Sequence, residues 1–168
     1  MDFGAEYANY AADVSRTVPV DGRFTPRQRA VYNAVLRVQR AAMDMLRPGN
    51  VLADYTREVG RIMESELIGL GLLDAESIRN QPEQAPLYKR FFMHGISHLL
   101  GIDVHDVGNR YHPFEAGMVF TCEPGIYIRD EGIGIRLENN ILITADGPVD
   151  LTADIPIDPD EIENGMNP

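Results

Sequence analysis

The sequence predicts an α+β domain, because two segments with strand patterns flank a segment with helix patterns. Residues 1–20 contain short β-prone runs on either side of a turn, and residues 117–144 read as two strands joined by a second turn. Between them, apolar residues recur at helical spacing over residues 25–69. The composition, 44% hydrophobic and 24% charged in 168 residues, is typical of a globular domain with a substantial core.

The first predicted hairpin places two aspartates on one face. We expect its turn at Ala8 and Asn9, and a two-residue loop there pairs Asp13 with Gly4. Asp2 then lies two positions further along on the same face, within diagonal reach of Asp13. Two carboxylates would therefore share one side of this hairpin.

Two helices are predicted next. Thr25, Pro26 and Gln28 supply an N-cap, a first-turn proline and a capping-box partner, and Pro48-Gly49 ends the run. A second helix is expected from about Val51 to Leu67. We interpret the apolar stripes of both helices as core.

The remaining polar segments are predicted to be irregular. Residues 74–90 contain two prolines and are expected to form a loop. Residues 154–168 are acidic and rich in proline, and are expected to form a solvated strap or a frayed end. We place the end of the domain at residue 163, with residues 164–168 as a tail.

The second predicted hairpin raises a problem of charge. If Asp130 and Glu131 form its loop, Glu123 lies directly opposite Glu138. Like charges in that position destabilise a hairpin, whereas a cation between them would make a binding site. The alternative is a register shifted by one residue, which would separate the two glutamates.

All four histidines of the chain fall within residues 94–112, and three of them are in the stretch HGISHLLGIDVHD. Imidazole is the side chain most used for metal ligation and for proton transfer near neutral pH. His94 and His98 fit the spacing of a helical zinc motif, but Gly95 stands where that motif needs a glutamate. Any metal here would need ligands from elsewhere in the chain.

The two hairpins supply such ligands. Together they offer four carboxylates, which with one imidazole would suit two divalent cations lying roughly 3.5–4 Å apart and activating water for hydrolysis. Hard oxygen donors with a single histidine suit Mn²⁺, Co²⁺, Fe²⁺ or Zn²⁺. The four carboxylates are Asp2, Asp13, Glu123 and Glu138.

Charge and cysteine content limit the partners and the compartment. A net charge of −11 argues against nucleic acid and against anionic membrane surfaces. No apolar run is long enough to span a membrane, and the first residues lack the features of a signal peptide. The single cysteine, Cys122, favours a reducing compartment. We therefore expect a cytoplasmic protein without a nucleic-acid or membrane partner.

Four segments, in order and together with the residues between them, closely resemble the catalytic domain of the Xaa-Pro aminopeptidases (aminopeptidase P). This group is part of the wider pita-bread family, which includes prolidase, and the resemblance extends to about Glu163. Ser97 in HGISH resembles aminopeptidase P more than prolidase, in which glycine is common at that place. The segments are DFGAEYANYAADVSRT, HGISHLLGIDVHDVG, FEAGMVFTCEPGIYI and GIGIRLENNILIT.

The resemblance implies a pita-bread fold and a role for individual residues. His94 and His105 match family histidines that contact the substrate and stabilise the tetrahedral intermediate, while Tyr127 and Arg136 resemble groups that orient the ligands. His112 is interpreted as a loop residue beside Pro113. The residues that match the ligands of two divalent ions, with Mn²⁺ expected first, are Asp2, Asp13, His98, Glu123 and Glu138.

The implied activity is hydrolysis of the bond between an N-terminal residue and proline, with Glu123 as general base and peptides with proline in second position as substrates. Prolidase activity and a catalytically silent binding module are the alternatives. The family's catalytic domain begins well before its first aspartate ligand, so we expect this chain to be a carboxy-terminal part, with the fold incomplete at its amino-terminal half. Apolar surface left open in this way is expected to favour homo-oligomers and to leave little activity.

Overall fold

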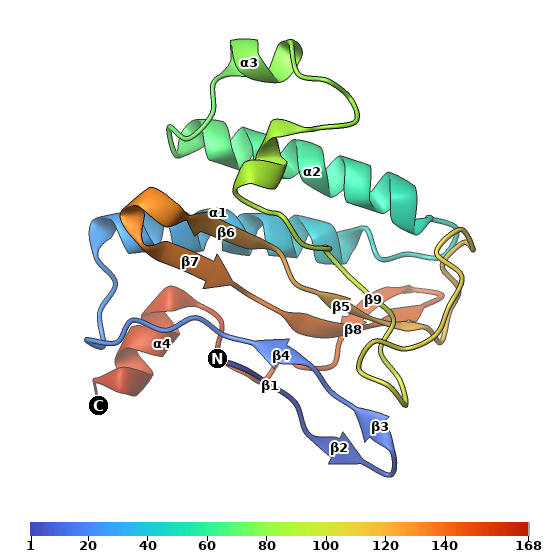
Figure 1. Cartoon of the computed structure of the whole chain (residues 1–168). Helices are drawn as coiled ribbons and strands as arrows, with labels where there is room; N and C mark the ends of the chain where they lie inside the picture. Colours follow the sequence, from blue (N-terminus) through green and yellow to red (C-terminus); the bar gives the residue numbers. More distant parts are fainter. Residues whose placement is uncertain (168) are drawn as a thin grey trace.

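The computed structural model describes residues 1–167, in which an N-terminal hairpin, two packed helices and a second, longer hairpin follow one another (Figure 1). This is the predicted α+β order. Residue 168, the last of the predicted tail, lies outside the described residues. Within residues 1–167, none of the helices combines the length and the apolar character needed to cross a membrane.

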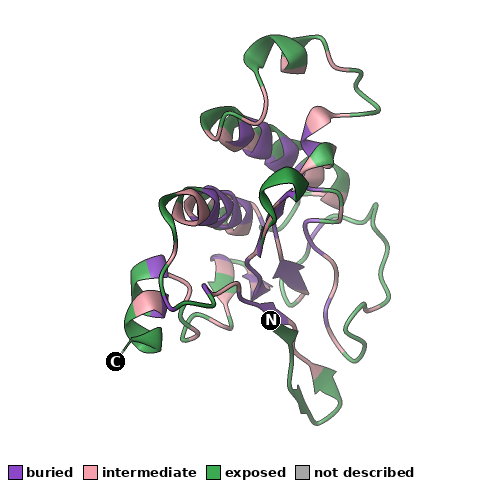
Figure 2. Ribbon diagram, turned by 60° about the vertical axis from the view of Figure 1, so that its left-hand side comes forward, coloured by how far each residue is buried: buried purple, intermediate pink, exposed green. Residues whose placement is uncertain are grey.

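The N-terminal hairpin consists of four two-residue strands, β1 (Asp2–Phe3), β2 (Glu6–Tyr7), β3 (Tyr10–Ala11) and β4 (Val14–Ser15). Tyr7 pairs with Tyr10 and Asp2 with Ser15, so a single register runs through all four strands. Ala8 and Asn9 form the turn with positive φ angles of 53° and 69°, as a type I′ turn requires. The predicted turn and register are confirmed. The tip of the hairpin is exposed (Figure 2).

The two predicted helices are also confirmed. α1 (Pro26–Asp44) begins with a full capping box, in which Gln28 N donates to Thr25 Oγ1 over 3.2 Å and Thr25 N donates to Gln28 Oε1 over 2.9 Å. α2 (Leu52–Gly69) packs along α1, and α1 in turn packs on the strands of the second hairpin. Buried residues line both helices (Figure 2), and the core therefore lies on the two sides of α1.

The second hairpin has two paired stretches separated by a gap. β6 (Gly125–Ile128) and β7 (Ile133–Arg136) pair on either side of a short 3₁₀ turn, η2 (Arg129–Glu131), which ends at Gly132 with a φ of 62°. β5 (Val119–Cys122) pairs with β8 (Asn139–Thr144), and β9 (Gly147–Asp150) adds a third strand. Both stretches share one register, which confirms that Glu123 faces Glu138.

Two segments predicted to be irregular contain helices. Residues 74–90 include α3 (Ala75–Arg79), capped by Asp74, and the 3₁₀ turn η1 (Leu87–Arg90). The acidic C-terminal segment forms α4 (Pro159–Met166), so the expected strap or frayed end is wrong and the boundary placed after residue 163 falls inside this helix. α4 is stabilised by burial of Ile162 and by ion pairs from Arg29, which are contacts that local sequence does not reveal.

Candidate metal centre

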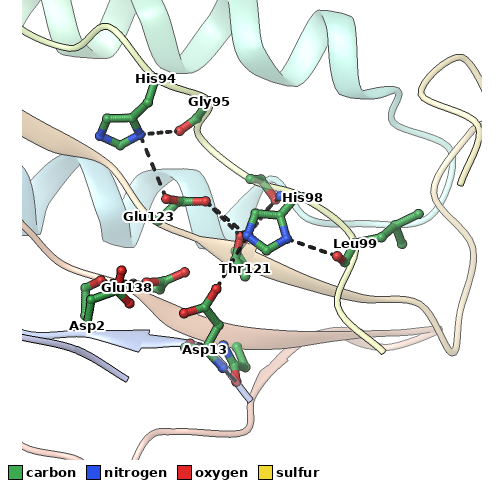
Figure 3. Close-up of polar contacts among 12 residues, drawn as sticks. Asp2, Asp13, His94, Gly95, His98, Leu99, Thr121, Glu123 and Glu138 are labelled. Carbon is green, nitrogen blue, oxygen red and sulfur yellow. Dashed lines mark hydrogen bonds and ion pairs between the residues drawn. The ribbon is translucent and has the colours of Figure 1, made fainter. Parts of the chain in front are cut away.

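Glu123 and Glu138 lie in the gap between the two paired stretches of the second hairpin. There the backbone amides bond to other segments: Glu123 N donates to Ile96 O over 2.9 Å, and Glu138 N donates to Ser15 O over 3.1 Å. The histidine-rich segment and the N-terminal hairpin are thereby attached where the two glutamates face each other (Figure 3). These two main-chain bonds thus bring three distant segments to one site.

The two aspartates of the N-terminal hairpin reach the same site. Asp13 is fixed through its main chain, because Asp13 N donates to Asn140 Oδ1 over 3.1 Å and Asn140 Nδ2 donates back to Asp13 O. Burial, followed by the charge of Asp2, raises the pKa of Asp13. Asp2 accepts a hydrogen bond from Arg136 Nη2 over 2.5 Å. The predicted diagonal pair of carboxylates is present.

His98 turns one ring nitrogen towards the carboxylates. Its Nδ1 lies 3.0 Å from Leu99 O, so a neutral ring that donates there leaves the lone pair on Nε2. Nε2 lies 3.4 Å from Glu123 Oε1 and 3.6 Å from Asp13 Oδ2. Nε2 is therefore free to act as a metal ligand.

The donor set fits divalent cations. Ligand atoms of Asp13, His98 and Glu138 all lie within 4.8 Å of one another. Glu138 is 1% exposed, and its Oε1 is buried without a hydrogen-bond partner among the described residues. Burial above all, and then neighbouring carboxylates, raises the pKa of Glu138 to about 7, and burial raises that of Glu123 to about 7. A cation would supply the missing partner and favour the charged carboxylates.

The other predicted histidines divide into two groups. His94 Nε2 lies 2.8 Å from Tyr127 Oη, and burial lowers the pKa of His94. The His105 ring stacks on that of His98, with centroids 4.1 Å apart. His112 is in an exposed loop, where its Nε2 lies 2.9 Å from Glu115 Oε1. His94 and His105 thus contact residues of the site, whereas the ring of His112 bonds to Glu115, which is not a proposed ligand.

The site opens to one side. A hollow of about 580 Å³ runs beside the N-terminal hairpin, and Asp2, Asp13 and His105 are among the residues that line it. A ligand could therefore approach the carboxylates without displacing the core.

Comparison with known proteins gives the family. Residues 1–145 match the model described as metallopeptidase family M24. The chain belongs to metallopeptidase family M24. The Xaa-Pro aminopeptidase of Haemophilus influenzae is 43% identical over 99% of this chain and 41% of its own length, and that of Escherichia coli is 45% identical over 97% and 39%.

Solved structures agree with this placement. Zinc-substituted E. coli aminopeptidase P in complex with product matches with a TM-score of 0.89 and 44% identity, over 99% of this chain and 40% of that one. Proline aminopeptidase P II from Yersinia pestis matches with a TM-score of 0.89 and 47% identity, over 99% and 41%. The predicted pita-bread fold is confirmed, and the chain spans about two fifths of the length of these M24 relatives.

Three side chains of this M24 chain support the site and were missed in the sequence. Ser15 Oγ donates to Glu138 Oε2 over 2.7 Å and accepts from Arg136 Nε over 2.8 Å. Thr121 Oγ1 accepts from His98 N over 3.1 Å, while Asn140 holds Asp13. Each lies two residues from a predicted ligand on a strand, so the two-residue period of strands could have identified all three.

Proposed function

We propose that this chain carries the two-metal centre of a Xaa-Pro aminopeptidase. The observation that carries the proposal is the convergence of Asp13, His98 and Glu138, whose ligand atoms lie within 4.8 Å of one another, at a buried Glu138 oxygen without a partner among the described residues. Mn²⁺ is the proposed metal, and Co²⁺, Zn²⁺ or Fe²⁺ suit the same donors. The proposed ligands are Asp2, Asp13, His98, Glu123 and Glu138.

The bound cations would polarise the scissile carbonyl and lower the pKa of water. Glu123 is the proposed general base, since its carboxylate lies at the site, with Oε1 3.4 Å from His98 Nε2, and a positioned carboxylate can take up and return a proton. Tyr127 orients His94 through their 2.8 Å hydrogen bond. We propose that His94 and His105 contact the substrate, and that Arg136 orients Asp2 directly and Glu138 through Ser15.

The proposed substrates are peptides with proline in second position, since the relatives are named Xaa-Pro aminopeptidases. Prolidase activity, or binding of such peptides without cleavage, are the competing functions. The single buried cysteine, Cys122, supports the cytoplasm as the proposed compartment. The charge of −11 supports the proposal that nucleic acid and anionic membranes are not partners.

We also propose that the chain associates with itself. Phe3, Tyr7 and Tyr10 are 55%, 88% and 64% exposed on the N-terminal hairpin. Within the described residues β1 pairs only with β4, so its outer edge is free for pairing between chains. Sedimentation at micromolar concentration tests this, and a monomer at all concentrations would contradict it.

The experiment for the main proposal combines metal binding with peptide specificity. The metal-free chain is titrated with Mn²⁺, and hydrolysis of an Xaa-Pro-Xaa peptide is compared with that of the matched Xaa-Ala-Xaa peptide. We expect two ions per chain and slow hydrolysis confined to the proline peptide. Failure to bind Mn²⁺, or equal cleavage of both peptides, would contradict the proposal. Cleavage only of Xaa-Pro dipeptides would indicate prolidase, and binding without cleavage a silent module.

A further inference from the structure

Arg16 is a buried cation without an ion-pair partner among the described residues. It directly follows β4 and is 4% exposed, yet it forms no ion pair with any carboxylate of residues 1–167. Its guanidinium instead donates four hydrogen bonds, all to main-chain carbonyls. Burying a charge costs much free energy unless the group is paired or hydrogen-bonded, so these four hydrogen bonds must offset the desolvation of Arg16.

The four carbonyls belong to three different segments. Nη1 donates to Ser15 O over 3.0 Å and to Glu138 O over 2.7 Å. Nε donates to Pro156 O over 2.8 Å, and Nη2 to Ile155 O over 3.2 Å. The planar fork of arginine therefore joins the N-terminal hairpin, the link between β7 and β8 that contains Glu138, and the segment before α4.

The main-chain groups of Glu138 point away from the opposite strand of the second hairpin. Neighbouring Leu137 N bonds across the hairpin to Pro124 O, and alternate residues of an antiparallel ladder turn their N–H and carbonyl outwards. The N–H of Glu138 bonds to Ser15 and its carbonyl to Arg16, so both main-chain groups are held by the same corner of the N-terminal hairpin. Its carboxylate meanwhile faces those of Glu123 and Asp13, which repel it when charged.

We propose that Arg16 is a positioning residue of the metal centre, which fixes Glu138 by its carbonyl and joins the 155–156 segment to the site. This inference rests on the proposed metal centre. Arg16 does not face the donors, and its contribution is to fix the main chain from which the Glu138 carboxylate extends. Loss of residues that orient metal ligands typically weakens metal binding by about 10- to 100-fold.

The test compares Arg16→Met and Arg16→Lys with a matched control, Tyr32→Phe. Tyr32 Oη donates to Ile157 O over 2.8 Å, so the control loosens the same C-terminal segment without touching Glu138. Co²⁺ affinity and the visible absorption of bound Co²⁺ are measured, together with amide exchange at Glu138 in the metal-free chain. Lysine keeps the charge but cannot reach four carbonyls, so it should rescue only in part.

We expect Arg16→Met to weaken Co²⁺ binding by about tenfold or more, to alter the Co²⁺ spectrum and to speed exchange at Glu138. Arg16→Lys should lie in between, and Tyr32→Phe should match wild type in all three. Wild-type spectra and exchange in both Arg16 variants, or equal changes in Tyr32→Phe, would overturn the inference. If Arg16→Met fails to fold, Arg16→Lys against Tyr32→Phe still decides. If the wild-type chain binds no Co²⁺, the proposed metal centre is contradicted. The rate of amide exchange at Glu138 would still show whether Arg16 fixes the main chain of Glu138.

Discussion

The carboxylate of Glu138 has two unlike oxygens. Oε2 accepts a hydrogen bond from Ser15 Oγ, whereas Oε1 is buried with no donor among the described residues. A buried oxygen of this kind is costly, and the neighbouring carboxylates raise the cost. A bound cation would remove both penalties together. The unpaired Oε1 atom of Glu138 therefore favours a metal site.

Glu138→Gln tests this at the level of one residue. The amide keeps the size of the side chain but loses the negative charge that would attract the cations. We expect Mn²⁺ binding to fall by at least about tenfold and the stoichiometry of two ions per chain to be lost, as measured by calorimetric titration. His112→Ala is the control, since His112 is in an exposed loop, where its ring bonds to Glu115 and not to a proposed ligand, and it should bind metal as wild type does. Unchanged stoichiometry in Glu138→Gln would remove Glu138 from the ligand set.

The two hairpins could be predicted from sequence because their information is local. Once the turn residues are assigned, counting outwards gives every opposed pair, and Asp2, Asp13, Glu123 and Glu138 follow from that count. The outward partners of the two glutamate amides could not be predicted in this way. They are the carbonyls of Ile96 and Ser15, which are distant in sequence.

The short helices show the same limit. α3 and α4 have 5 and 8 residues, too few for a clear apolar period. Their N-caps are Asp74 and Asp158, and aspartate is common in turns and loops as well as at helix starts. Contacts with Arg29 and the core decide that α4 forms, and those contacts exist only in the folded chain. Arg16 was missed for a similar reason, since its partners are carbonyls of three segments.

Packing between elements can be tested at Gly60 of α2. Alanine in place of glycine inside a helix normally stabilises it by about 1 kcal/mol. A Cβ at Gly60, however, would lie 2.7 Å from Cε1 of the buried Tyr88 in η1. We expect Gly60→Ala to lower the free energy of unfolding by about 1–3 kcal/mol, as measured by urea denaturation.

Gly69→Ala, in the last turn of the same helix, is the matched control. A Cβ there meets no atom within 4 Å, so the variant should be as stable as wild type or slightly more stable. Equal stability of the two variants would show that η1 does not pack on α2 as described.

The molecule as a whole concentrates negative charge at its site. Of 26 acidic residues, four extend into one place from two hairpins, in a chain of net charge −11. Arg136 is the nearby cation that opposes this repulsion for Glu123 and Glu138. Without metal, the charged carboxylates repel one another and destabilise the fold. The packing of the helices and the apolar core must offset this repulsion.

The stability of the metal-free chain should consequently fall as pH rises. Burial, with neighbouring carboxylates, raises the pKa of Glu123 and Glu138 from 4.5 to about 7. The folded chain then binds more protons than the unfolded chain between pH 4.5 and 7, so the stabilisation present at low pH is lost through that window. The lowered pKa of His94 has the opposite effect: below about pH 6.5 it makes stability rise with pH. The raised pKa of Asp13 makes stability fall with rising pH, as the two glutamates do.

We expect the free energy of unfolding to be on the order of 3 kcal/mol lower at pH 8 than at pH 5.5, since one pKa unit corresponds to about 1.4 kcal/mol. Urea denaturation of the chelated chain at both pH values measures it. Glu138→Gln should reduce this difference, because one titrating group is gone. Saturating Mn²⁺ at pH 8 should restore stability, as an ion that binds only the folded chain must. If the chelated chain is as stable at pH 8 as at pH 5.5, or more stable, titration of these carboxylates is not coupled to folding. If Mn²⁺ also has no effect on stability, the carboxylates do not form a metal site.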